Sequence, residues 1–379
     1  MALYNHVSVW NDKPHLWPRG YWCNGHILVD AEKMSKGKGN FLMLNESIER
    51  FSADATRFAC ANAGDSLLDA NFEVSTANNA IILLTKEEEW IKSVLEAEKG
   101  QKLRLGETEF FMDKAFENEM CNLINKTESC YSKMMWREGL QTGFFEMQIL
   151  RDIYRDWCVR TEIPMHRELI LRFIEAQTVL LAPVCPHFCE FVWGNILGKE
   201  NSVLLCGWPK AENADVWVTR AFSFLQKSIR NFRATLGKNK NVSKKGYILV
   251  ATEYPQWKQE ILKFMQSYPK LDDGSFPKDF TIALKDYGKD KNLTTSEQQK
   301  TMQFASFARG QYEMAGLSAL DISLPFDQAS VLEENIGYIA STLGLEGAEV
   351  HEVGSEGCPG SERAKQMAAP GNPVFVAQT

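Results

Sequence analysis

The sequence lacks the cysteine pattern of a disulfide-stapled or zinc-binding protein. Its nine cysteines are scattered over 379 residues, and no two of them form a Cys-x-x-Cys pair. Disulfide scaffolds are short, cysteine-dense and secreted, whereas intracellular chains keep their thiols reduced. The pattern therefore predicts free thiols in a reducing compartment.

The sequence also lacks long apolar runs and a leader-like start. No run reaches the roughly 20 apolar residues that a membrane-spanning helix needs. The first residues, Met-Ala-Leu-Tyr-Asn-His, contain no basic segment followed by an apolar one. We therefore expect a cytoplasmic protein without a membrane partner.

Overall positive charge is missing as well. The formal net charge is −7, so the composition does not advertise a nucleic-acid-binding protein. A local basic face would suffice for such binding, because contacts to phosphate depend on the local field rather than on the net charge.

Hydrophobic patterning divides the chain into parts of different character. Residues 1–72 contain a strand signal at 25–29 and a basic loop, but too little chain precedes that loop to build a doubly wound sheet. Residues 73–237 carry apolar stripes at helical spacing, which predict an antiparallel helical bundle. A basic linker at 238–245 leads to a small α/β domain at 246–379. The predicted fold class is multidomain and mainly α.

Individual elements follow from periodicity, prolines and caps. Proline ends one helix at Ala182-Pro183, and Pro186 suits the first turn of the next. A capping box at Thr294 and Glu297 opens another helix, and Asp54 is expected to cap a helix. The stretch 354–371 is expected to be a loop. Further helices are predicted at about 136–157, 165–181, 215–236, 256–267, 295–315 and 328–343, and strands at about 247–251, 319–324, 348–353 and 373–377.

A short basic loop carries the most chemical information. Lys33 and Lys36 flank Ser35, while Gly37 and Gly39 permit tight turns and close approach of the backbone to a ligand. Such a loop can pair with phosphates and stabilise the charge that develops in nucleotidyl transfer. The GxxxxGK[ST] spacing of a phosphate-binding P-loop is absent. On composition alone, a solvated turn is the commoner explanation.

The same loop resembles a family signature. Lys33–Gly37 is similar to the KMSKS motif of class I aminoacyl-tRNA synthetases, with glycine in place of the final serine. The family's x-Gly-Asn follows at Lys38–Asn40, and its Asp-x-x-Arg is matched by Asp54 and Arg57. Stretches similar to the leucyl-tRNA synthetases of archaeal and eukaryotic cytosolic type are Asn24–His26, Ala63–Asp65, Asp69–Phe72, Gly139–Glu146 and Met165–Glu190. The resemblance covers essentially the whole chain.

The resemblance implies a domain plan and a reaction. Residues 1–72 would end a Rossmann-type catalytic domain, 73–237 would be the anticodon-binding-type bundle, and 246–379 would contact tRNA. The implied enzyme joins leucine to AMP at the expense of ATP, used with Mg²⁺, and transfers leucine to tRNA(Leu). No bound metal is implied in this chain. A complex with other synthetases is a further implied partnership.

The resemblance also assigns roles to residues. Lys36 would contact the ATP phosphates and Lys33 would support the closed state of the loop, which makes both catalytic. Ser35 would lie with them at the nucleotide. His26 is interpreted first as a structural residue of the strand before the loop, with contact to ATP as the alternative.

The HIGH motif, the leucine pocket and the editing domain of the family have no counterpart in this sequence. We therefore expect a truncated portion that does not aminoacylate tRNA by itself. The alternative is a non-catalytic tRNA-binding or protein-interaction protein derived from the synthetase.

Two further clusters have competing explanations. Cys185, His187 and Cys189 suggest a metal site, but alternate positions on a helix point to different faces, so packing is the preferred explanation. A basic strip is either a solvated face or a set of tRNA phosphate contacts. Its members are Arg230, Arg233, Lys238, Lys240, Lys244 and Lys245.

Overall fold

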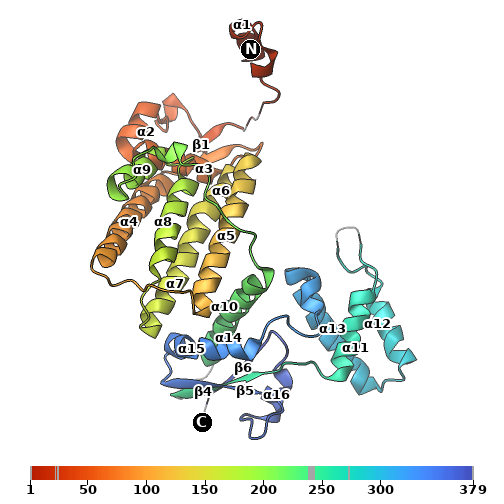
Figure 1. Ribbon diagram of the computed structural model, residues 1–379. Coiled ribbons are helices and arrows are strands. Elements are labelled where there is room, and N and C mark those ends of the chain that lie inside the picture. Colours follow the sequence, from red (N-terminus) through yellow and green to blue (C-terminus); the bar gives the residue numbers. More distant parts are fainter. Residues whose placement is uncertain (1, 22, 24, 238–243, 272–273, 378–379) are drawn as a thin grey trace. The chain divides into compact units, whose positions relative to one another are not determined.

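A computed structural model describes residues 2–21, 23, 25–237, 244–271 and 274–377, with only the backbone for residues 2, 36, 311, 314, 315 and 318 (Figure 1). The chain is mainly helical, as predicted. It forms two compact units. Unit 1 comprises Met1–Thr108, Phe116–Arg155 and Pro164–Ala214, and unit 2 comprises Glu109–Ala115, Asp156–Ile163 and Asp215–Thr379.

Unit 1 contains a small mixed sheet near its start. Strand β1 (Ile27–Val29) pairs antiparallel with β2 (Glu32–Lys33) and parallel with β3 (Ala70–Phe72). The strand predicted at 25–29 is therefore confirmed in β1. The segment between β2 and β3 contains the loop turn η2 (Lys36–Lys38) and the helices α2 (Leu44–Phe51) and α3 (Ala53–Ala63), and α1 (Ala2–Val9) and η1 (Pro14–Leu16) precede the sheet.

Long helices make up the rest of unit 1 (Figure 1). The apolar stripe predicted from Trp136 onward is buried at Leu140, Phe144 and Tyr154, which are each 0 % exposed. This burial explains why the segment is helical, since the stripe faces the core. The start of α5 and the end of α7 belong to unit 2. The elements are α4 (Val74–Lys99), α5 (Phe111–Ser132), α6 (Trp136–Leu140), the π-helical turn η3 (Gln141–Glu146), α7 (Met147–Thr161), α8 (Arg167–Leu181), α9 (Pro186–Glu190), the π-helical turn η4 (Phe191–Ile196) and η5 (Val203–Leu205).

Glycines let these helices approach closely. A Cβ atom on Gly139 would lie 2.2 Å from Cε1 of Tyr131, and one on Gly143 would lie 2.9 Å from Cγ2 of Thr127. No side chain fits at these distances, so the Gly-x-x-x-Gly spacing follows from the packing.

Unit 2 contains a second three-stranded sheet, in which β4 is central. Strand β4 pairs parallel with β5 and antiparallel with β6. The strands predicted near 247–251, 348–353 and 373–377 are thus confirmed. The elements are α10 (Val216–Leu236), β4 (Lys245–Val250), α11 (Gln256–Ser267), α12 (Phe280–Asp290), α13 (Thr295–Ala315), η6 (Gly316–Leu320), α14 (Gln328–Glu334), α15 (Ile336–Leu343), β5 (Gly347–Glu352), α16 (Glu362–Met367) and β6 (Val374–Ala377).

Two helix predictions in unit 2 meet different outcomes. The capping box is confirmed, because the Glu297 N–H donates to Oγ1 of Thr294 and the Thr294 N–H donates to the Glu297 carboxylate. The helix predicted at 328–343 is instead two helices that join at Asn335. Asn335 is buried, and its Oδ1 accepts a hydrogen bond from the Trp157 indole at 3.1 Å. The break thus falls at a buried residue whose side chain is bonded to another helix.

Two other predictions in unit 2 are wrong. The strand expected at 319–324 is the end of η6 followed by irregular chain. Its apolar residues Leu320 and Ile322 pack into the cluster of α11–α13, so their alternation reflects burial against helices rather than sheet pairing. The expected loop at 354–371 contains α16, which Ser361 caps through its side chain.

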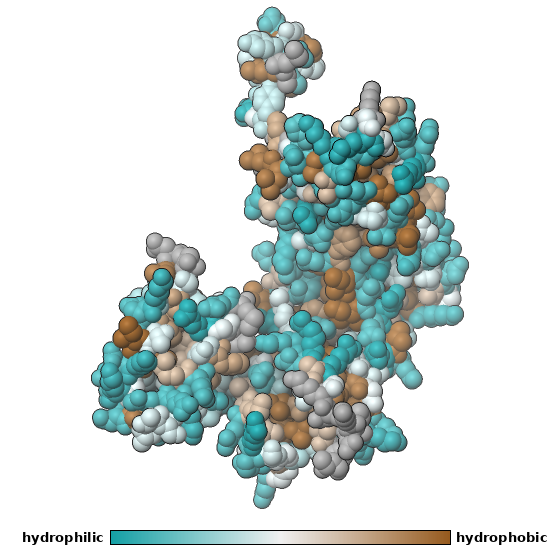
Figure 2. All heavy atoms as spheres, turned by 180° about the vertical axis from the view of Figure 1, so that it is seen from behind, coloured by the Kyte–Doolittle hydropathy of each residue, from teal (hydrophilic) through white to brown (hydrophobic). Residues whose placement is uncertain are grey.

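Apolar side chains interrupt the largely hydrophilic surface (Figure 2). Several belong to the first 72 residues, where Leu44, Leu67 and Leu68 are 70 %, 83 % and 76 % exposed. Among the described residues, no helix is long and apolar enough to cross a membrane.

Candidate functional site

The basic loop follows a tight hairpin. Asp30 and Ala31 connect β1 to β2 with φ angles of 48° and 65°, the left-handed conformation that two-residue hairpins use. Asn71 of β3 holds this turn, because its Oδ1 accepts the Ala31 N–H at 2.6 Å. The Asp30 carboxylate in turn accepts the N–H of Val74 at the start of α4. The loop therefore emerges from a fixed base.

Asn40 closes the loop. Its Oδ1 accepts the Ser35 N–H at 2.9 Å, and its Nδ2 donates to the carbonyl oxygen of Lys33 at 3.2 Å. Gly39 next to it has a φ of 69°, which favours glycine. The x-Gly-Asn that follows the basic motif thus fastens the two ends of the loop together.

The two lysine side chains of the loop that the structure describes, Lys33 and Lys38, lie at the surface. Lys33 is exposed, and Lys36 lies in the turn η2, although its side chain is outside the described atoms. Lys38 lies 3.5 Å from Glu32, but both side chains are more than half exposed, so solvent screens this pair. The loop therefore presents its positive charge to solvent, and Ser35 is half-buried beneath it.

His26 lies immediately before β1, the strand that leads into the hairpin, and not in the loop. Its backbone N–H donates to Oδ1 of Asp69 at 2.7 Å, while its ring is 78 % exposed. A Cβ atom on Gly25 would lie only 2.3 Å from the same oxygen of Asp69. The Gly-His pair is therefore positioned by Asp69; Asn24 is outside the described residues.

Asp54 and Arg57 of α3 join the segment after the loop to the helical bundle. The Asp54 carboxylate accepts the N–H groups of His187 at 3.3 Å and Phe188 at 2.5 Å. Arg57 donates to the carbonyl oxygens of Pro183 at 2.7 Å and Val184 at 2.9 Å. The two side chains thus satisfy backbone groups on both sides of the turn between α8 and α9.

The predicted capping role of Asp54 is confirmed, but for a different helix. Its own helix is capped by Ser52, whose hydroxyl accepts the Ala55 N–H. Asp54 caps α9, a helix 133 positions away in the sequence. Local capping patterns cannot reveal such a contact. The Asp-x-x-Arg motif nevertheless singled out Asp54 and Arg57 in the sequence.

The other end of α3 is fastened in the same way. Gly64 ends the helix with a φ of 109°. Asp65 then accepts the N–H groups of Trp136 and Arg137 at the start of α6. Helix α3 is therefore tied at both ends to the bundle of unit 1.

The cysteines near this joint are buried thiols. Burial raises the pKa of Cys185 and of Cys189 above the ordinary value. Cys185 contacts the carbonyl oxygen of Asp54. Elevated pKa values favour the inert protonated thiol, and no group of three metal-binding side chains occurs in the part of the chain that the structure describes.

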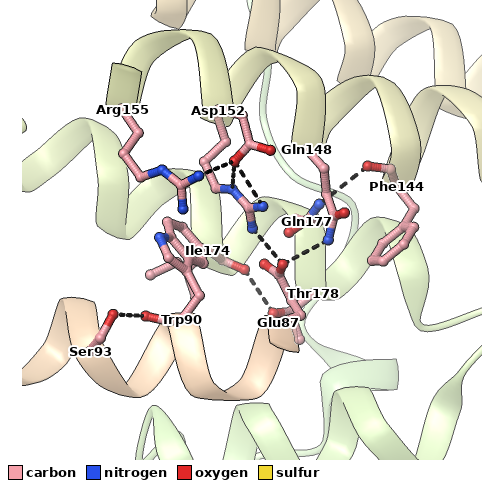
Figure 3. A network of polar contacts seen from close by, with 11 residues as sticks. Glu87, Trp90, Ser93, Phe144, Gln148, Asp152, Arg155, Ile174, Gln177 and Thr178 are labelled. Carbon is pink, nitrogen blue, oxygen red and sulfur yellow. Dashed lines mark hydrogen bonds and ion pairs between the residues drawn. The ribbon is translucent and has the colours of Figure 1, made fainter. Parts of the chain in front are cut away.

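A buried polar network crosses the bundle (Figure 3). Glu87 of α4 accepts hydrogen bonds from Arg151 and Gln148 of α7. Burial raises the pKa of Glu87, and Arg151 opposes that rise. The Arg151 guanidinium also lies 4.3 Å from the centre of the Trp90 ring. The network fixes the pairing of α4 and α7.

The basic strip belongs to unit 2. Arg230 and Arg233 are exposed on the last turns of α10, and Lys245 begins β4. Lys244 forms an exposed ion pair with Glu346 at 2.6 Å. Lys238 and Lys240 are outside the described residues, so the strip is only partly visible.

Three family models match consecutive parts of the chain. Residues 8–82 match the family model described as tRNA synthetases class I (M), 113–248 match the anticodon-binding domain of tRNA ligase, and 250–325 match the leucine–tRNA ligase, RagD-binding domain.

Curated relatives match nearly the whole chain. The cytoplasmic leucine–tRNA ligase of Arabidopsis thaliana is 37 % identical over 100 % of this chain and 37 % of its own length. That of Pongo abelii is 37 % identical over 99 % of this chain and 32 % of its own. The leucine–tRNA ligase of Aeropyrum pernix is 28 % identical over 99 % of this chain and 36 % of its own. The chain thus spans about a third of the length of these relatives, and it belongs to the leucine–tRNA ligase family, of which it represents a C-terminal portion.

Proposed function

We propose that this chain supplies the ATP-phosphate loop and the tRNA-binding body of a cytoplasmic leucine–tRNA ligase. The reaction converts leucine, ATP and tRNA(Leu) to leucyl-tRNA, AMP and pyrophosphate. The observation that carries the proposal is the loop closed by Asn40, which runs from exposed Lys33 at the end of β2 to Lys36 in the turn η2. Its supporting context is the relationship to leucine–tRNA ligases over the whole chain.

The lysines act by electrostatics. Lys36 pairs with the phosphates of ATP, which enters with Mg²⁺ as substrate, and Lys33 stabilises the loop in its closed state. Positive charge there stabilises the pentacoordinate phosphorus and the departing pyrophosphate. Ser35 offers a hydroxyl at the same turn. His26 is proposed as a positioning residue of the preceding strand, with a nucleotide contact as the alternative.

Charge stabilisation is only part of catalysis. Alignment of the reactants contributes about 7–11 kcal/mol in well-oriented reactions. The leucine pocket and the HIGH motif of the family, which provide alignment, have no counterpart in these 379 residues. We propose that residues 1–379 alone do not form leucyl-adenylate.

The bundle and the basic strip are proposed to contact tRNA phosphates. Arg230 and Arg233 are exposed and adjacent on one helix, as backbone-binding residues often are. Lys238, Lys240 and Lys245 would extend this surface. Lys244 would first have to leave Glu346.

A chimeric enzyme tests the proposed catalytic role. The matching segment of the Arabidopsis relative is replaced by this chain, and leucine-dependent ATP–pyrophosphate exchange is measured. Lys36→Ala and Lys33→Ala are each expected to lower the exchange rate by roughly 100-fold or more. The matched control is Lys86→Ala, which removes an exposed charge from α4. Equal rates for all three variants would contradict the proposal.

A second function, binding of a partner protein, is proposed for residues 250–325. It is supported by the match to a RagD-binding domain model. Mixing the purified chain with purified RagD and measuring co-elution in size-exclusion chromatography tests it. Separate elution at micromolar concentrations would contradict this second function.

A further inference from the structure

A groove in unit 2 has the features of a docking surface. It encloses about 1070 Å³ between α11, α13 and the segment around α16. Its floor contains buried Ile261 and Phe304, which are 2 % and 8 % exposed. Small-molecule sites enclose roughly 300–1000 Å³, so this open groove can accept several side chains of a polypeptide.

Large apolar side chains remain exposed along the groove. Trp257 is 42 % exposed, Phe307 is 47 % exposed and Met367 is 60 % exposed, and all three line the same hollow. The rings of Trp257 and Phe304 lie edge to face, with centroids 5.7 Å apart. Exposed apolar side chains gathered in one hollow and rimmed by polar residues are typical of protein-binding sites.

The carboxylates of the groove already have partners. Glu260 forms an ion pair with Lys291 at 3.1 Å and accepts a hydrogen bond from Tyr287. Glu297 is held by the N–H and hydroxyl of Thr294 in the capping box. Neither carboxylate therefore needs a partner from outside.

Lys258 has a different environment. Its Nζ lies 5.6 Å from the Trp257 ring centre and 5.2 Å from that of Phe304. Among the described residues no carboxylate forms an ion pair with it, and burial lowers its pKa. Lys300, on the facing helix α13, likewise has no salt bridge within the described chain. The charge available to a ligand is therefore positive, beside an apolar floor.

We propose that this groove binds an amphipathic segment of a partner protein, with apolar side chains in the hollow and a carboxylate at Lys258. The inference rests on the second proposed function and specifies the chemistry of its partner. Trp257, Phe304 and Phe307 take the apolar side chains. A carboxylate of the partner makes a charge-assisted contact with Lys258. The Lys258 ammonium group stays over the rings of Trp257 and Phe304.

An RNA ligand fits the same groove less well. Exposed aromatic rings and lysines can stack and pair with single-stranded nucleotides. Glu260 and Glu297, however, offset much of the charge of Lys258, Lys291 and Lys300 along the same groove. The groove therefore lacks the strongly positive track that a phosphate backbone needs, whereas a single carboxylate needs only Lys258. The observations therefore favour a protein segment, and RNA binding is an outcome that the experiment must exclude.

Peptide selection on the purified full chain tests the proposal. Short random peptides displayed on phage are selected for binding, and individual peptides are then titrated by fluorescence polarisation. Peptides rich in Leu, Ile, Phe, Asp and Glu are expected, together with weaker binding of a short poly-uridine RNA. Phe307→Ser and Lys258→Glu are each expected to weaken peptide binding by roughly tenfold or more.

Matched controls separate the groove from general effects. Ile282→Ser changes an exposed apolar residue on α12, and Lys278→Glu reverses an exposed charge, both outside the groove. The selected peptides are expected to bind both control variants as tightly as the unaltered chain. Peptides that bind equally to the groove variants, no selected peptide, or tighter binding of RNA would overturn the proposal. If peptides bind equally to the groove variants, residues 250–325 can still bind a partner protein at another surface. The co-elution experiment with RagD tests that partner binding separately.

Discussion

Arg57 donates a hydrogen bond to the carbonyl oxygen of Val184, although 127 positions separate the two residues. The Val184 carbonyl lies in the turn after α8, where backbone groups lack partners within the helix. Because α3 follows the basic loop through α2, this bond ties the loop's own segment to the bundle. We predict that the Asp-x-x-Arg motif holds the loop and the helical bundle of unit 1 as one piece.

Replacing Asp54 tests one half of this tie. Asp54→Ala leaves the N–H groups of His187 and Phe188 without their acceptor, which is expected to cost about 2–4 kcal/mol of unfolding free energy. Asp54→Asn keeps one acceptor oxygen and is expected to cost less. Urea denaturation measures both, with exposed Glu49→Ala as the control. Equal stability of Asp54→Ala and the control would contradict the capping role.

Replacing Arg57 tests the other half. Arg57→Lys keeps the charge but loses the fork that reaches both Pro183 and Val184. We expect faster amide hydrogen exchange at residues 185–189 and a loss of about 1–3 kcal/mol. Exchange measured by mass spectrometry should change little around Lys92, whose partner is Glu88 of its own helix. Unaltered exchange at 185–189 would show that the turn does not depend on Arg57.

The buried Glu87–Arg151 pair predicts a pH effect. Arg151→Met leaves Glu87 buried without its cation, which is expected to cost about 3–5 kcal/mol near neutral pH. Burial alone then raises the pKa of Glu87 above its unfolded value of about 4.3. The folded variant therefore binds more protons than the unfolded one, and its stability falls as pH rises above about 4.

Thermal unfolding of Arg151→Met across pH values measures this slope. The control is Arg155→Met, because Arg155 is about half exposed and pairs with the exposed side of Asp152. The double variant Glu87→Gln with Arg151→Met should recover stability and lose the slope. A slope that persists in the double variant would assign it to another group.

Gly25 offers a prediction about the strand before the loop. Gly25→Ala would place Cβ 2.3 Å from the Asp69 carboxylate and 2.7 Å from its backbone nitrogen. The backbone atom cannot move aside cheaply, so we expect about 1–3 kcal/mol of destabilisation. Gly20→Ala is the matched control, since its Cβ would meet no atom within 4 Å. Equal melting temperatures would contradict the close packing of Gly25 on Asp69.

Sequence patterns predicted features that depend on neighbours along the chain. The helix with its capping box at Thr294 and the buried stripe from Leu140 to Tyr154 arise from local spacing, and both are confirmed. Features that depend on distant partners were not predictable from spacing. Asp54 caps a helix 133 positions away, and Asn335, at the break between α14 and α15, is bonded to the indole of Trp157.

In the candidate site, too, contiguous features could be predicted and features that depend on distant residues could not. The basic loop was recognisable because its lysines and glycines are contiguous. The hydrogen bonds that hold the hairpin before the loop could not be predicted, since Asn71 contacts Ala31 across 40 positions and Asp69 contacts His26 across 43. Sheet pairing of β1 with β3 brings these residues together, and that pairing could not be read from either segment alone.

Whether this chain is a tRNA-binding body is tested by the binding of purified residues 1–379 to a tRNA(Leu) transcript, compared with a non-cognate tRNA, across a salt series. We expect preferential binding to tRNA(Leu) that weakens by roughly 10³-fold or more between about 50 and 200 mM salt. Arg230→Glu combined with Arg233→Glu should weaken binding and flatten the salt dependence. No binding, or equal binding to both tRNAs without dependence on these arginines, would contradict the claim that this chain is a tRNA-binding body.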